Sequence, residues 1–450
     1  MTTMQTVERG LSRALLAVAM FAAAVFALNT PAHAMKIQEV TTKSGIKAWL
    51  VEEHAVPLVA MRFAFEGGSA QDPAGKEGLA NFLTGMMDEG AGDLESHAFQ
   101  KRMEDIAMRM SFEDSKDFLY GSFETLSENR KAAVELLKLV VNKPRFDNEA
   151  VERIRSQLIA GLAYAKRDPN KVASEHWFAS AFAGHPYGRP SNGTEESLAG
   201  IKRDDLEAYR RNTFAKANLR VVVVGDINAK EMGDMLDDIF GTLPDKPKLT
   251  AVPNVDPKPK TKQTVIDMPV PQSVAVFGGL SIPRQDKDFM PAFVLNHLLG
   301  GGGFASRLME EVREKRGLAY SVYSYLQPFR SSSVFLGGVA TKNEEMAQSL
   351  DVIRAEFKRA VETGPTQQEL DNAKSYLTGS FALRFDTNAK IANQLLYFFT
   401  EDFGVDYVDR RNKEVEAVTL EDVKRAAKRV FANDLYVTVV GKPKGLATGG

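Results

Sequence analysis

The chain has 450 residues, no cysteine and a formal net charge of −2, with 57 basic residues against 59 acidic ones. The absence of cysteine excludes disulfides, thiolate metal ligands and a cysteine nucleophile. The balanced, dispersed charge gives no basic surface for nucleic acid or an anionic membrane, so neither is expected as a partner. A chain of this length is expected to build two or three domains with large cores.

The first 34 residues have the features of a cleaved targeting segment. Arg9 and Arg13 precede an apolar run at 14–28, and Ala32-His33-Ala34 forms a small-x-small cleavage site. The run is shorter than the roughly 20 residues of a spanning helix, which argues against an uncleaved anchor. We therefore expect residues 1–34 to be a signal peptide, the mature protein to be periplasmic or secreted, and no membrane span to remain after cleavage.

The mature chain contains two halves with the same pattern. In each half a strand-like run precedes a helix, a long helical region follows, and a helix precedes a strand at the end. The ranges are 59–65, 75–87, 148–167, 202–214 and 219–224 in the first half, and 273–280, 289–299, 366–385, 419–431 and 435–440 in the second.

A segment rich in proline and lysine, at 242–262, separates the halves and is typical of an extended linker. We expect an N-terminal domain at 35–243, a linker at 244–262 and a C-terminal domain at 263–445. Helices and strands alternate, and a hairpin pattern covers 318–327 and 333–341. This indicates an α+β fold of two repeated domains, each a mostly antiparallel sheet with helices packed on one face.

The stretch 78–87, GLANFLTGMM, resembles the first helix of the pitrilysin/insulinase family of zinc peptidases, which includes mitochondrial processing peptidase. Active members carry His-x-x-Glu-His there, because two histidines at i and i+4 share one helix face and ligate zinc while the glutamate acts as base. The matching positions are Asn81, Thr84 and Gly85, and the family's third ligand, a later glutamate, falls at about Gly161. The resemblance implies a degenerate zinc site and a chain that binds no metal or other cofactor.

The histidines offer no replacement site. None of the six is paired with another at helical spacing, so we expect none of them to ligate a metal. The family resemblance covers nearly the whole mature chain and implies that the two domains face each other as half of a clamshell.

The second half carries the segment GGGGFASRLMEEVREKRGLAY at 300–320. Helical spacing from Phe304 to Lys315 puts Phe304, Leu308 and Val312 along one stripe, with Gly317 as the C-terminal cap. Arg313 then lies on the last turn and Tyr320 at the entry of the next strand, so both can point into one cleft.

On residue type alone, Arg313 also suits a surface ion pair and Tyr320 an ordinary strand face. Arg307 and Arg316 are expected to cap the helix or to stay solvated. The glycine run indicates a flexible turn, since the Lys-Ser/Thr of a phosphate loop is missing.

The complete frame around Arg313 and Tyr320 resembles the Arg/Tyr pair of the same family. There the arginine hydrogen-bonds a substrate carbonyl and the tyrosine stabilises the oxyanion of the tetrahedral intermediate. A glycine-rich stretch at the position of Gly301 and Gly302 is thought to contact substrate in the family.

The family also contains heterodimers in which one chain carries the zinc motif and its sibling the Arg/Tyr pair. The resemblance thus implies a non-catalytic partner subunit of a heteromeric zinc endopeptidase. Such a subunit would bind peptide and complete the active site of a homologous zinc-bearing sibling, in a heterodimer or larger assembly, through Arg313 and Tyr320. The zinc is expected in the sibling, and no activity is expected of this chain alone. The alternative is a structural or peptide-binding protein with a peptidase-like fold and no role in proteolysis. A self-sufficient peptidase is disfavoured, because no histidine pair is present.

Overall fold

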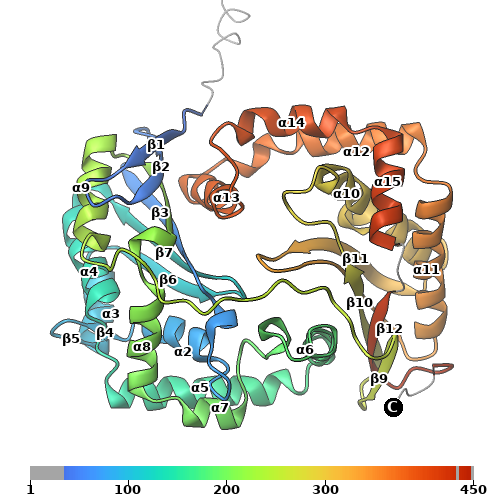
Figure 1. Cartoon of the computed structure of the whole chain (residues 1–450), viewed down its shortest axis with the longest axis horizontal. Helices are drawn as coiled ribbons and strands as arrows, with labels where there is room; N and C mark the ends of the chain where they lie inside the picture. The colour runs from blue at the N-terminus through green and yellow to red at the C-terminus, as the bar shows by residue number, and fades with distance from the viewer. Residues whose placement is uncertain (1–34, 432–434, 447–450) are drawn as a thin grey trace, which may run out of the picture. The chain divides into compact units, whose positions relative to one another are not determined.

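The computed structural model describes residues 35–431 and 435–446, so the expected signal peptide lies outside the described residues. The residues from Glu39 onward form one compact unit. Within it, one β-sheet is built from the first half of the chain and another from the second (Figure 1). Helices pack on both sheets, which confirms the α+β class.

The first sheet has six strands in the order β1-β2-β8-β3-β7-β6. Strands β2 and β8 are parallel, whereas β8–β3, β3–β7 and β7–β6 are antiparallel. The bounds are β1 Gln38–Thr41, β2 Lys47–Glu52, β3 Leu58–Glu66, β6 Arg109–Asp114, β7 Phe118–Leu126 and β8 Leu219–Gly225. A separate two-stranded ribbon consists of β4 Gly90–Ala91 and β5 Leu94–Glu95.

The second sheet has five strands in the order β11-β12-β10-β13-β9. Only the β13–β9 pair is parallel, so both sheets are mostly antiparallel as expected. The bounds are β9 Gln263–Asp267, β10 Gln272–Leu280, β11 Ala319–Pro328, β12 Ser333–Lys342 and β13 Tyr436–Gly441.

Most helices cover one face of the sheet of their own half. The main core of the first half joins that sheet to α2, α4, α8 and α9, and the core of the second half joins the other sheet to α10, α11 and α15. The first-half helices are α2 Leu79–Met86, α3 Ser96–Asp105, α4 Arg130–Asn142, α5 Asn148–Ala165, α6 Pro169–Ala181, α7 Glu195–Gly200, α8 Arg203–Thr213 and α9 Ala229–Phe240. The second-half helices are α10 Phe289–Asn296, α11 Met346–Glu362, α12 Gln367–Gly379, α13 Asn388–Thr400, α14 Tyr407–Ala417 and α15 Leu420–Phe431. Within the described residues, no helix combines the length and the apolar character needed to cross a bilayer.

The opposite face of the first sheet is covered by α13, a helix of the second half. Phe399 on α13 stacks on Trp49 of β2 with ring centroids 4.4 Å apart. Asn393, also on α13, accepts a 2.7 Å hydrogen bond from Nε of Arg62 on β3. Every residue of β3 from Val59 to Phe65 is buried, because successive side chains meet helices on opposite faces.

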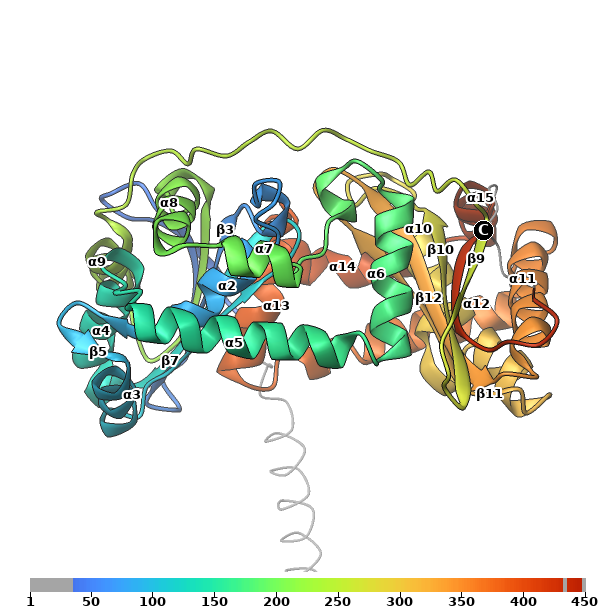
Figure 2. The same ribbon diagram turned by 90° about the horizontal axis from the view of Figure 1, so that it is seen from below.

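The second sheet receives the reciprocal cover from α6, a helix of the first half, which lies along β10 and β13 (Figures 1 and 2). Trp177 on α6 is 2 % exposed, and its indole N–H donates a 3.0 Å hydrogen bond to the carbonyl of Tyr436. Ala173, one turn earlier, packs against Val274 and Val440. Each sheet is therefore closed on its second face by a helix of the other half, so the expected covering of one face is only part of the packing.

The segment between α9 and β9 is extended (Figure 2). Gln71 and Thr250 exchange two hydrogen bonds, and the backbone N–H of Val255 donates to the carbonyl of Ser331 at 2.9 Å. Residues of both halves thus hold this segment along its length. The limits 244 and 262 that the sequence suggests for a linker, and the domain limits on either side, stay predictions.

Two expected helices are shorter than predicted. The first begins at Leu79 instead of residue 75, because Gly78 adopts a left-handed φ of 88° and ends the preceding turn. The expected helix 366–385 ends as α12 at Gly379. Beyond it, a short turn buries Phe381, whose ring lies 4.6 Å from the guanidinium carbon of Arg411.

Replacing Trp177 by alanine should lower the free energy of unfolding by about 3–5 kcal/mol, because a large cavity opens between α6 and the second sheet. Urea unfolding followed by circular dichroism measures this change. The matched control is Tyr164→Ala on α5, where the side chain is 74 % exposed and the expected change is within about 0.5 kcal/mol. Equal effects of the two substitutions would contradict the role assigned to α6.

Candidate functional site

Arg313 and Tyr320 are brought together by a helix–strand corner. Arg313 lies on a short π-helical turn at Met309–Glu314, and β11 begins at Ala319. Between them Gly317 has a φ of 62°, and its N–H donates a 2.8 Å hydrogen bond to the carbonyl of Arg313. The predicted glycine cap is therefore confirmed, since a left-handed residue at this position is what reverses the chain.

The guanidinium of Arg313 lies between two aromatic rings. Its central carbon is 5.1 Å from the ring centroid of Tyr320 and 4.7 Å from that of Phe304. The two aromatic residues are 82 % and 72 % exposed, respectively. Phe304 is thus not on the buried stripe with Leu308 and Val312 that the sequence predicted. The helix begins only after Ser306, and Phe304 lies in the 3₁₀ turn that precedes it.

The polar groups of the pair are largely unengaged. Arg313 makes one ion pair, from Nε to Oε1 of Glu314 at 3.6 Å. Within the described residues, neither its N–H groups nor the Tyr320 hydroxyl makes a hydrogen bond. The pair lines a cavity of about 410 Å³ at the edge of the second sheet, lined also by residues of β12 such as Ala340 and Lys342. Donors in this state can bind a carbonyl oxygen or a developing oxyanion.

The two other arginines of this segment differ from each other. Arg316 pairs with Glu311 at 2.6 Å and is half-exposed. Arg307 is buried and donates two hydrogen bonds, of 2.7 and 2.8 Å, to the carboxylate of Glu369 at the start of α12. The expectation that Arg307 caps its helix or stays solvated is therefore wrong. The arginine is buried in an ion pair with a residue that lies 62 positions away in the sequence.

The glycine run is a packed element and not the flexible turn predicted from the pattern. His297–Gly301 forms a π-helical turn that continues α10. A Cβ added at Gly301 would lie 2.6 Å from the amide nitrogen of Asn296, and one at Gly302 2.7 Å from the carbonyl of His297. Glycine is required here by close packing, and Gly301 stays exposed to solvent.

On α2, the positions that match the zinc motif are occupied by internal contacts. Asn81 donates a 3.0 Å hydrogen bond from its amide to the carboxylate of Asp114, and the Thr84 hydroxyl donates to the carbonyl of Asn81 at 2.8 Å. A Cβ added at Gly85 would lie 3.4 Å from a methyl group of Ile154 on α5. This face of α2 therefore presents an amide side chain and an apolar contact where the zinc motif has two histidines.

Gly161, the position of the third ligand, lies farther along α5 and is exposed. An added Cβ there would meet nothing within 4 Å. In residues 35–431 and 435–446, no group of three or more histidine, aspartate or glutamate side chains is placed to hold a metal ion. None of the four degenerate positions lines the cavity of Arg313 and Tyr320.

Beside Asn81 lies a buried charged group that the sequence did not single out. Burial raises the pKa of Asp72 to about 7, although its carboxylate accepts hydrogen bonds of 2.9 Å from the N–H groups of Gly78 and Ala80. Burial also raises the pKa of Asp114 and lowers that of Lys116 to about 8. Asp72 caps the N-terminus of α2, where a carboxylate is electrostatically favoured. Its burial therefore has a structural role, and no catalytic role is needed to account for it.

A second feature missed by the sequence is a cavity of about 680 Å³ in the second half, lined by Arg284, Arg384 and Lys390 among others. Its signal in the sequence is the mixture of basic and aromatic residues over 381–411. That composition alone does not distinguish a cavity from an ordinary amphipathic helix pair.

Comparison with known proteins identifies the fold as that of one family. The sequence profile described as "Insulinase (Peptidase family M16)" matches residues 48–195, and that described as "Peptidase M16 inactive domain" matches residues 200–377. The crystal structure of a peptidase M16 inactive domain from Pseudomonas fluorescens has a TM-score of 0.85 and 30% identity to this chain. The match covers 92% of this chain and 99% of the P. fluorescens chain.

The chain belongs to the insulinase (peptidase M16) family. It is 28% identical over 419 residues to the "Non-peptidase homolog YmxG" of Helicobacter pylori, covering 93% of this chain and 96% of that protein. It is also 25% identical over 417 residues to the "Uncharacterized zinc protease YmxG" of Bacillus subtilis, covering 91% and 99%. The family resemblance drawn from the sequence is therefore confirmed. This M16 member contains no His-x-x-Glu-His.

Replacing Asp72 by asparagine should destabilise the protein more at about pH 5 than at about pH 8. The folded-state pKa of about 7 lies above the ordinary value of an aspartate. The wild-type protein therefore loses stability as the pH rises from about 4 to 7 and this carboxyl ionises. The variant has no carboxyl at this position and does not lose this stability. The difference between the two effects should reach about 1–3 kcal/mol in urea unfolding. The exposed Asp256→Asn serves as control, and a pH-independent effect of Asp72→Asn would contradict the assigned burial.

Proposed function

We propose that this M16 protein is the non-catalytic partner subunit of a heteromeric zinc endopeptidase. Its Arg313 and Tyr320 would bind the peptide and complete the active site of a homologous zinc-bearing sibling. The zinc would belong to the sibling, and this chain alone would not cleave peptides. The observation that carries the proposal is the Arg313–Tyr320 pair, with its exposed tyrosine and its arginine free of hydrogen bonds to the described residues, in a chain without the zinc motif.

The chemistry of the pair supports a role at a reacting carbonyl. The Arg313 guanidinium is held between two rings, which restricts its orientation while leaving its N–H groups available. Such a fork binds a peptide carbonyl through charge-assisted hydrogen bonds. The Tyr320 O–H is a neutral donor that can follow the same oxygen as it becomes an oxyanion.

The degenerate helix supports the division between two chains. Asn81 is committed to Asp114, and Gly85 lies against Ile154, so this chain offers no metal-bound water to a peptide held by Arg313. A donor pair without a nucleophile accelerates hydrolysis only if another chain supplies the nucleophile. Gly301 is exposed and a glycine allows a peptide backbone to approach closely, so we include Gly301 and Gly302 in the proposed peptide site, although neither lines the cavity of the pair.

The proposal extends to the location and organisation of the protein. The N-terminal features predict export, so we place the complex in the periplasm or outside the cell. The domains would be 35–243 and 263–445, joined by 244–262, and each would help to enclose the peptide. The names of the relatives support a non-catalytic role unevenly, because the H. pylori protein is called a non-peptidase homologue and the B. subtilis one a zinc protease.

In the complex of this chain with a sibling that carries His-x-x-Glu-His, Arg313→Ala should lower kcat/KM for peptide cleavage by about 100- to 1,000-fold. Assembly, measured by size-exclusion chromatography, should be unchanged. Arg354→Ala, which removes an arginine of α11 that also has one acidic partner, is the control and should leave turnover unaltered. Unchanged turnover of the Arg313 variant in an intact complex would sink the in-trans role and favour the structural or peptide-binding alternative.

Zinc analysis by mass spectrometry gives a second test. The purified chain should contain no stoichiometric zinc, and EDTA should not shift its unfolding midpoint, because the ligand positions are Asn81, Gly85 and Gly161. The mixed complex should contain about one zinc per pair of chains and lose cleavage activity on chelation. One equivalent of zinc on this chain alone would overturn the assignment of the metal to the sibling.

A further inference from the structure

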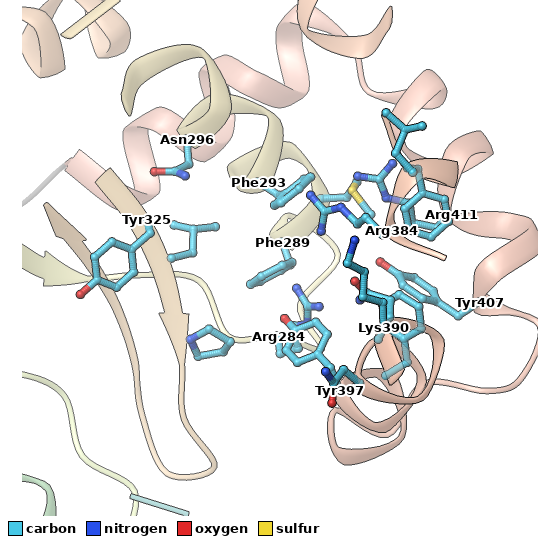
Figure 3. Close-up of a pocket in the computed structure, with 18 residues that line it drawn as sticks. Arg284, Phe289, Phe293, Asn296, Tyr325, Arg384, Lys390, Tyr397, Tyr407 and Arg411 are labelled. Carbon is cyan, nitrogen blue, oxygen red and sulfur yellow. The ribbon is translucent and has the colours of Figure 1, made fainter. Parts of the chain in front are cut away.

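The cavity of about 680 Å³ in the second half has the size of a small-ligand pocket. It lies between α10, β11, the turn after α12, α13 and α14 (Figure 3). All of its lining residues belong to the segment 284–411, and it shares none with the cavity of Arg313 and Tyr320.

The charge of this cavity is one-sided. Arg284, Arg384, Lys390 and Arg411 line it, and no aspartate or glutamate is among the lining residues. In Figure 3 the charged ends of Arg284, Arg384 and Lys390 point toward the same space. Several like charges around one cavity repel each other unless an anion offsets them.

Only some of these cations are engaged by the protein. Arg411 donates a 2.7 Å hydrogen bond to the carbonyl of Leu377 and is structural. Arg284 lies 3.7 Å from Glu401, and its guanidinium packs on aromatic rings. Arg384 is exposed, and among the described residues it has no ion-pair or hydrogen-bond partner.

Lys390 adds a second positive charge at an unfavourable place. It is the third residue of α13, and the helix dipole disfavours a cation in the first turn. Asp386 offsets it in part, with a contact of 2.7 Å, but Lys390 is still 58 % exposed. An anion in the cavity would gain from Arg384, from Lys390 and from the N-terminus of α13 together.

The remaining lining determines what kind of anion fits. Figure 3 shows Phe289 and Phe293 on one side and Tyr397 and Tyr407 on the other. The Arg284 guanidinium lies 4.3 Å from the Phe289 ring centre and 5.1 Å from that of Tyr397. Phe293 and Tyr407 are therefore the walls left for a ligand. An aromatic or large aliphatic group can pack between these walls, so the ligand combines an anionic end with an apolar body.

Amide groups supply the third element. The side chains of Asn296, Asn393 and Gln394 line the cavity. The amide oxygens of Asn296 and Asn393 accept from Ser324 and Arg62, but within the described residues their amide nitrogens donate to nothing, and Gln394 has no partner at all. Unpaired amides suit a peptide backbone, whereas a fatty acid would leave them unsatisfied.

We propose that this cavity binds the C-terminal end of a peptide that finishes in an aromatic or large aliphatic residue. The terminal carboxylate pairs with Arg384 and Lys390, the last side chain lies between the aromatic walls, and the amides bond the preceding peptide groups. The binding requires no sibling and no proteolysis, so its failure and that of the in-trans proposal are separate results.

The test is calorimetric titration of the purified full chain with acetyl-Ala-Ala-Phe carrying a free carboxylate, and with the same peptide as its C-terminal amide. We expect the acid to bind. The amide should bind at least about tenfold more weakly, because a charge-assisted pair is lost. The double variant Arg384→Ala/Lys390→Ala should weaken binding of the acid by a similar factor. Both side chains are exposed, so the variant should fold, and circular dichroism checks this.

The matched control is Arg102→Ala/Lys358→Ala, which removes two exposed cations of α3 and α11, Lys358 having an i, i+4 acidic partner as Lys390 does. It should bind the acid peptide as the wild type does. Equal affinity for acid and amide, unaltered binding by the Arg384/Lys390 variant, or no binding of the acid would each overturn the proposal. A third titration uses dodecanoate. If dodecanoate bound more tightly than the peptide, the proposed ligand would be wrong, and the cavity would be a site for an amphipathic carboxylate.

Discussion

The burial of both faces of each sheet is the constraint on which the rest of this structure depends. Strand β3 is buried on both faces, and leaving its apolar side chains in water would forfeit roughly 25 cal/mol for each Å² of apolar surface exposed. The helices that close the second faces, α6 and α13, come from the opposite halves of the chain. Neither half can therefore complete its own burial, and the two sheets are held together by the same contacts that stabilise them.

This reciprocal cover also decides which surfaces remain available for function. Helix α13 turns Leu395, Leu396 and Phe399 away from solvent as it packs on the first sheet. Side chains spaced three and four residues apart share a helix face, so Lys390 and Tyr397 lie together on the side that lines the 680 Å³ cavity. The cavity thus follows from the way α13 is anchored, since its position is set by the sheet that it covers.

How much the sequence could predict depended on how far apart the interacting residues are in the chain. The strands at 59–65 and 273–280 and the corner from Arg313 to Tyr320 are local, and Gly317 alone determines where that corner turns. The glycine run was misread, because a flexible turn and a tightly packed π-helical turn use the same residues. Only the neighbours of Gly301 distinguish them.

Partners distant in the sequence were not accessible to pattern reasoning. Arg307 looks like a surface cation in its helix, and only the fold brings Glu369 to it. The exchange of α6 and α13 is likewise invisible in the sequence. On β3, Arg62 lies on the face that α13 covers, and an arginine in a strand is typical of a solvated face. Gly161, which the family resemblance matched to the third zinc ligand, falls in the long helix expected at 148–167, but its neighbours could not be predicted.

The two candidate sites differ in what stability explains. On α2, Asn81 and Gly85 are accounted for by contacts inside the protein, with Asp114 and with Ile154. Tyr320 is 82 % exposed, and among the described residues the guanidinium of Arg313 makes a single ion pair of 3.6 Å, so the polar groups of the pair add little to folding stability. A cation–π contact of an arginine becomes stronger when a partner surface removes it from water. Arginine is accordingly enriched among the residues that contribute most to binding free energy at interfaces. Contacts inside the protein therefore do not explain the polar groups of the corner at 313–320, whereas the α2 face with Asn81 and Gly85 is part of the fold.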